Sequence, residues 1–155
     1  MGFTLFKFLH ILTMFLAVAS AAVPEVVLHR VARSNSVPAI RVVAGIAAGL
    51  GKLLPLFFVA GAIFGLLAAA TGELDFFAPW LIASYIVFII AMATGGALTG
   101  PWAGKMLAAA QASPDSGPSA ELTALIHDRK ALLGSVILMS SIVVIVFLMV
   151  AKPGG

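Results

Sequence analysis

The sequence has 155 residues, of which 62% are hydrophobic and only 10% charged, with a formal net charge of +3 and no cysteine. Soluble domains are nearer half apolar and a quarter charged, so this composition predicts an integral membrane protein. The positive charges are too few and too scattered for a nucleic-acid-binding surface. The lack of cysteine excludes disulfides, thiolate metal sites and cysteine nucleophiles.

Four stretches of the chain are long and apolar enough to cross a bilayer. A helix needs about 20 mostly apolar residues to span the hydrocarbon core, and only a helix satisfies its own backbone there. The sequence therefore predicts an all-α fold, a four-helix transmembrane bundle that forms a single domain over residues 1–155. The predicted spans are residues 3–23, 42–71, 80–100 and 131–151.

The first span contains the segment KFLHIL, which places His10 among apolar residues. On a helix, Thr13, Met14 and Ala17 follow His10 on the same face, and leucines occupy much of the remainder. This small and weakly polar stripe is expected to face protein. An alternative is that the span is a signal peptide with AVASAAVPE as its cleavage region, but His10 and Thr13 interrupt the apolar stretch and favour a retained helix.

The connections predict the topology of the bundle. The first and third connections hold most of the basic residues, whereas the second is the short acidic segment GELDFFAP. The positive-inside rule therefore places these two connections in the cytoplasm and both termini on the outer, periplasmic side of a bacterial inner membrane. In the third connection, Pro118 is expected to open a helix that runs through ELTALIHDRK into the fourth span. The basic residues counted are Arg30, Arg33, Arg41, Lys105, Arg129 and Lys130 on the cytoplasmic side, and Lys7 and Lys152 on the other.

Glycine stripes predict how the helices associate. Small residues at intervals of four let helix backbones approach closely in lipid. Ordinary packing within one bundle is the first interpretation, and a homodimer or a membrane-protein partner is the alternative. Besides the lipid bilayer, such a partner is the only one expected, with no nucleic acid. The glycines concerned are Gly61, Gly65, Gly96 and Gly100.

His10 is the main candidate for a functional residue. Ionisable groups inside a membrane are costly and indicate function, although a neutral imidazole bonded to a neighbouring helix would be purely structural. His29 and His127 lie beside arginines and are expected on the solvated surface. No pair of histidines has metal-site spacing, and no complete catalytic motif is present, so no catalytic residue is predicted.

The segments KFLHIL, APWLIASY and LMVAKP together resemble a family of bacterial predicted integral membrane proteins of unknown function. More distantly, the first helix is similar to that of two groups with the pattern K-x-L-H, the haem-binding membrane protoporphyrinogen oxidase and the copper-resistance D-type membrane proteins. In the oxidase the first-helix histidine is a haem ligand, so the resemblance implies His10 as the iron ligand here. The oxidase also has a functional lysine in its third helix, where this chain has Ser84.

The functional hypothesis is a small membrane accessory module, of uncharacterised function, that holds haem b or a quinone near His10. Thr13, Met14 and Ala17 would line the cofactor, and Met14, Met92 or an open position would complete the coordination of the iron. Enzymatic activity is not expected, although an oxidase-like activity stays open. The alternative is a proton-coupled or small-solute transporter, which the sequence favours less because no carboxylate is predicted inside a span and only Pro55 is expected to break a helix.

Overall fold

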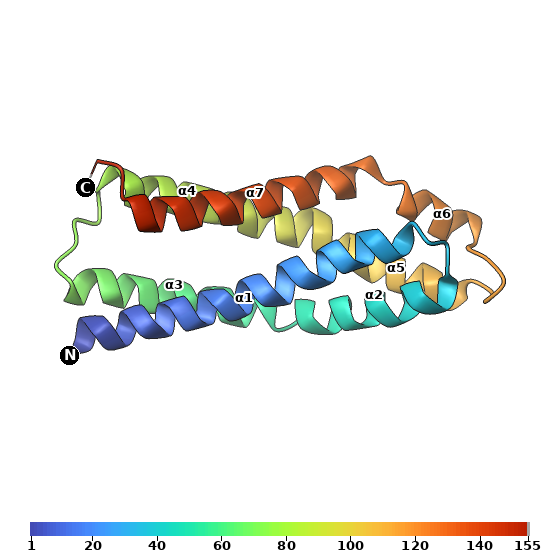
Figure 1. Cartoon of the computed structure of the whole chain (residues 1–155), viewed down its shortest axis with the longest axis horizontal. Coiled ribbons are helices and arrows are strands. Elements are labelled where there is room, and N and C mark those ends of the chain that lie inside the picture. Colours follow the sequence, from blue (N-terminus) through green and yellow to red (C-terminus); the bar gives the residue numbers. More distant parts are fainter. Residues whose placement is uncertain (155) are drawn as a thin grey trace.

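A computed structural model describes residues 1–154, which contain helices and no strands (Figure 1). The chain forms four segments long and apolar enough to cross a membrane, Gly2–Ala32, Val37–Thr71, Pro79–Ala112 and Ala120–Ala151. The predicted all-α fold with four membrane-spanning helices is therefore confirmed. The elements are α1 (Gly2–Ala32), α2 (Val37–Gly51), α3 (Leu54–Thr71), α4 (Pro79–Thr94), the π-helical turn η1 (Gly95–Thr99), α5 (Gly100–Ala112), α6 (Ala120–Ile126) and α7 (Arg129–Ala151).

The four segments are longer than the bilayer requires. They contain 31 to 35 residues, which at 1.5 Å per residue corresponds to about 46–52 Å against about 30 Å of hydrocarbon. The first helix does not end before Pro24, as the predicted span did, but continues to Ala32. The third continues through Pro101 to Ala112. The extra length lies at the end of the bundle that carries the two basic connections.

The helices are arranged as two antiparallel pairs that meet mainly at this basic end. The first part of α1 packs against α3, α4 packs against α7, and α2 packs against α1 and α5. Figure 1 shows the α1–α3 pair beside the α4–α7 pair, with both termini at one end and α6 at the other. Large apolar side chains such as Phe15 and Phe147 are exposed, as expected for surfaces that face lipid.

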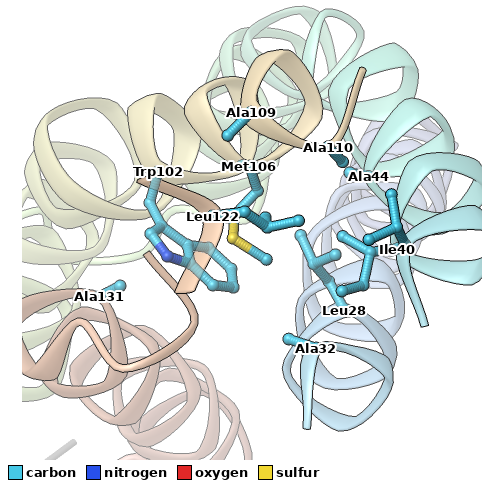
Figure 2. Packing of buried hydrophobic residues seen from close by; sticks show 12 residues of the cluster. Leu28, Ala32, Ile40, Ala44, Trp102, Met106, Ala109, Ala110, Leu122 and Ala131 are labelled. Atoms are coloured by element: carbon cyan, nitrogen blue, oxygen red, sulfur yellow. The ribbon is translucent and has the colours of Figure 1, made fainter. Parts of the chain in front are cut away.

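The main hydrophobic core lies at the basic end. Figure 2 shows Trp102, Met106 and Leu122 pointing toward Leu28 and Ile40. This core is shielded from solvent by α6 and the ends of α1, α2, α5 and α7. It therefore gives the part of the protein beyond the hydrocarbon a buried interior of its own. Its buried members are Leu28, Ala32, Val37, Ile40, Ala44, Trp102, Ala103, Met106, Ala109, Ala110, Leu122 and Ala131.

All four segments contain a proline or a break in the α-helix next to this core, and α1 runs continuously through its proline. Pro24 lies inside α1, α2 and α3 are separated at Lys52–Leu53 with Pro55 in the first turn of α3, and η1 precedes Pro101. The prediction that only Pro55 would break a helix is therefore wrong. The predicted continuous helix into the fourth span is also wrong, because α6 ends at Ile126 and α7 begins anew at Arg129.

The glycines of α3 form a close contact with α1. A Cβ atom at Gly61 would lie 2.5 Å from Met14 Cε and 3.1 Å from Thr13 Oγ1, and one at Gly65 would lie 2.8 Å from His10 Nδ1. Glycine is required here because the α1 side chains occupy the space of any side chain on α3. Gly61 and Gly65 thus serve packing within one chain. A Cβ at Gly96 would meet nothing within 4 Å, so Gly96 does not serve helix packing within the chain.

Substituting Gly65 by alanine is expected to destabilise the α1–α3 pair. The His10 ring is rigid and bonded to α3, so it cannot yield as a flexible chain end would, and overpacking of this kind costs about 1–3 kcal/mol. The matched control is Gly49→Ala, because nothing lies within 4 Å of a Cβ at Gly49. Thermal unfolding in detergent micelles measures the difference. Equal midpoint temperatures of unfolding for Gly65→Ala and Gly49→Ala would contradict the close contact between Gly65 and His10.

Candidate functional site

The first polar site consists of His10 and the α3 backbone. Nδ1 of His10 lies 2.7 Å from the carbonyl oxygen of Gly61. A carbonyl only accepts hydrogen bonds, so Nδ1 must carry the proton and donate it. The neutral ring then keeps an unprotonated Nε2 with a free lone pair. The backbone of α3 therefore sets both the tautomer and the orientation of the imidazole.

The other predicted residues of this site belong to the helix contact. The Thr13 hydroxyl donates to the carbonyl of Leu9 in its own helix at 2.7 Å. Met14 packs on Gly61, and Ala17 is fully buried. The space that the sequence suggested beside the ring is occupied by α3, and Met92 lines a different region, the cavity described below. The structure thus places one imidazole nitrogen at the first polar site, and Met92 does not lie beside it.

A second polar site connects α1 and α7 at the basic end. The Ser135 hydroxyl donates a short hydrogen bond to Oε1 of Glu25, and Nε2 of His29 lies 2.7 Å from the same hydroxyl oxygen. Because the hydroxyl proton is directed to Glu25, the His29 ring must donate through Nε2. The three groups form a continuous chain of hydrogen bonds, His29 to Ser135 to Glu25, between residues 110 positions apart.

Trp102 holds the imidazole of this chain in place. The rings of His29 and Trp102 are stacked with centroids 4.3 Å apart and an interplanar angle of 17°. The indole N–H in turn donates to the carbonyl of Leu125 at 3.0 Å. The interpretation of His29 as a solvated surface residue is therefore wrong. His127 is exposed and its ring bonds only to the Thr123 carbonyl within its own turn.

A cavity of about 500 Å³ lies beside Glu25, between α1, the α2–α3 junction and the η1–α5 region. We call it the central cavity. Most of its wall is alanine, glycine and proline, with Phe58 and Leu138 as larger apolar members, and its ionisable lining residues are Glu25 and Lys52. Its size is within the range of small-molecule binding sites. Pro24, the α2–α3 junction and η1 all border it.

Sequence reasoning missed this second site because Pro24–Glu25 was taken as the end of the first span. The signal was nevertheless present, since a helix that continues through Pro24 places Glu25 and His29 one turn apart on one face. Ser135 carried no such signal, because only the tertiary structure brings it to α1. Within residues 1–154, no group of three or more histidine, cysteine or acidic residues is arranged to hold a metal ion.

The fold and these two sites define a small four-span integral membrane protein with ionisable groups inside its helical bundle. A family model described as "Predicted integral membrane protein (DUF2269)" matches residues 4–153. The chain therefore belongs to this family, as the sequence resemblance indicated. No curated protein and no solved structure matches the chain.

Replacing Ser135 by alanine is expected to lower the free energy of unfolding by about 1–3 kcal/mol, because it leaves Glu25 and His29 without their shared partner. Ser140→Ala is the matched control, since Ser140 lies on the same helix and is exposed. Chemical unfolding in mixed micelles measures both variants. If Ser135→Ala proves as stable as Ser140→Ala, the hydrogen-bond chain does not hold α1 to α7.

Proposed function

We propose that this protein is a small membrane accessory module that holds haem b through Nε2 of His10. The observation that carries the proposal is the hydrogen bond from Nδ1 to the Gly61 carbonyl. Histidines that bind metals generally donate their other ring nitrogen to a carbonyl or carboxylate, which fixes the tautomer and raises the basicity of the ligating nitrogen. Haem, when bound, would supply one-electron chemistry that the side chains themselves lack.

The Nε2 atom is reachable from outside the protein. Among residues 1–154, the only buried side-chain polar atom without a hydrogen-bond partner is the hydroxyl of Tyr85. Nε2 has no protein partner and is therefore not sealed within the bundle. A ligand of Nε2 would have to approach from the lipid side of the α1–α3 pair.

The donor set supports one protein ligand for the iron. Ser84, at the position where the similar oxidase has a lysine, donates its hydroxyl to the Trp80 carbonyl at 2.7 Å and is not an iron ligand of the usual kind. Met14 is committed to the contact with Gly61. The proposal is therefore haem held by a single histidine of this chain, with the remaining axial position open or filled by a partner.

Quinol is the other group that this nitrogen fits. A neutral ring that donates through Nδ1 can only accept at Nε2, so it matches the hydroxyl of a quinol and not the carbonyl of the oxidised quinone. Haem takes precedence because the carbonyl-anchored imidazole is the usual arrangement of a metal ligand.

We place the protein in the bacterial inner membrane with both termini on the periplasmic side, as the distribution of basic residues indicates.

The test is the absorbance spectrum of the purified protein, oxidised and reduced, with quinone analysis of its lipid extract. Wild-type protein and the control His127→Ala are expected to show a haem Soret band that shifts on reduction, and His10→Ala is expected to lose it. A quinol site would instead give colourless protein with quinone that His10→Ala fails to retain. Colourless, quinone-free wild-type protein would refute the proposal.

Transport is a second candidate function, favoured by the helix interruptions and by the buried hydrogen-bond chain that ends at Glu25. Discontinuous helices and intramembrane carboxylates are typical of transporter sites. Proteoliposomes with an internal pH indicator test it: a proton flux driven by a membrane potential should be lost in Glu25→Gln and kept in the control Glu121→Gln. No flux above that of empty liposomes would remove this candidate.

A further inference from the structure

We propose that the central cavity binds the headgroup of an aminophospholipid, with its primary ammonium beside Glu25 and its phosphate at Lys52. This inference goes beyond the haem proposal and does not depend on it, because His10 is not among the residues that line the cavity. It rests on the hydrogen-bonding character of the cavity wall, on a buried carboxylate and an unpaired lysine that both line it, and on the position of the opening.

The backbone of the cavity wall offers acceptors that lack donors. Proline has no N–H, so Pro24 and Pro55 leave the carbonyls of the residues four positions earlier, Ser20 and Gly51, without their usual partners. In a π-helix the hydrogen bond runs to the carbonyl five residues earlier, so Pro101 leaves the carbonyl of Gly96 without its usual donor. These three carbonyl-bearing residues all line the central cavity. A ligand with several N–H donors complements such a wall.

Glu25 gives this wall a negative charge. It is only 9% exposed, its Oε1 accepts from Ser135, and its one ion-pair contact among residues 1–154 is with His29, whose Nε2 lies 3.6 Å away and is charged only when protonated. Removing a carboxylate from water is costly unless a positive group or several donors compensate. A primary ammonium supplies both a full positive charge and three donors.

Lys52 supplies the opposite charge at the rim. It is exposed, it lines the cavity, and no acidic residue pairs with it in the described chain. From Lys52 to the end of α3 at Thr71 the helical rise is about 29 Å, the thickness of the hydrocarbon core. Lys52 therefore lies at headgroup depth, where lipid phosphates are found.

The mouth of the cavity lies between the α2–α3 junction and the η1–α5 region. Its exposed lining residues come from the α2–α3 junction and from the η1–α5 region, Gly51, Lys52, Pro55, Gly96, Gly100, Pro101 and Gly104. An opening between two neighbouring membrane helices admits a lipid sideways. The apolar remainder of the wall suits the glycerol and upper acyl part of the molecule.

The experiment is native mass spectrometry of the protein released from nanodiscs that contain equal amounts of phosphatidylethanolamine, phosphatidylcholine and phosphatidylglycerol. Phosphatidylethanolamine is expected to be retained about tenfold more than phosphatidylcholine, because only the primary ammonium donates charge-assisted hydrogen bonds to Glu25. Glu25→Gln should abolish this preference and the exposed control Glu121→Gln should keep it. Lys52→Gln should weaken retention of phosphatidylethanolamine.

Four results would overturn the proposal. Equal retention of the ethanolamine and choline lipids would show that the primary ammonium is not recognised. Preferred retention of phosphatidylglycerol would show that the site selects anionic lipids. Stronger lipid binding in Lys52→Gln would show that the lysine itself neutralises Glu25. Displacement of the lipid by free ethanolamine at equal concentration would assign the site to a soluble amine.

A variant that adds bulk covers the case in which Glu25→Gln does not fold. A Cβ at Gly104 meets nothing within 4 Å, and leucine favours a helix more than glycine does, so Gly104→Leu should fold while it narrows the mouth. Its control is Gly49→Leu, equally open but outside the cavity lining. Loss of the phosphatidylethanolamine preference in Gly104→Leu alone supports the site, and its persistence in both variants contradicts it.

Discussion

The contact between α1 and α3 is the constraint on which the rest of the structure depends. In lipid the hydrophobic effect does not press helices together, so close backbone approach and interhelical hydrogen bonds must do so. Gly61 and Gly65 allow that approach, and the bond from the His10 ring to the Gly61 carbonyl adds a polar link. The same bond fixes the tautomer of His10. Packing and the proposed binding role are thus two consequences of one interaction, which reconciles the structural and functional interpretations of this histidine.

At the basic end the protein follows a different principle. There the chain has its own hydrophobic core and contains interrupted helices. Three prolines and a π-helical turn meet around one cavity, and π-helical turns often occur at functional sites. A carboxylate, a serine and a histidine lie beside it in a bonded chain. The bundle therefore has two polar regions, at different levels along its length and with different chemistry.

Hydrophobicity and the needs of the backbone in lipid were sufficient to predict the four spans and the all-α fold. The stripe that begins at His10 also predicted which face of the first helix contacts protein. The sequence could not show that α1 continues through Pro24, because proline ends many helices and only packing against α2 and α7 keeps this one intact. It therefore placed Glu25 and His29 outside the membrane region. The pairing of Glu25 with Ser135 was not predictable either, since it depends on how two distant helices cross.

The most direct test of the central claim is the tautomer of His10, measured by ¹⁵N NMR of protein labelled at histidine and reconstituted in lipid. The His29 and His127 resonances are assigned by substitution and removed from the comparison. The account predicts a neutral His10 ring with the proton on Nδ1 and an unprotonated Nε2, and a shift of that signal in Gly65→Ala as the contact is disturbed. A His10 ring protonated at Nε2 and bare at Nδ1 would contradict the hydrogen bond to Gly61, and with it the arrangement that leaves Nε2 free to bind.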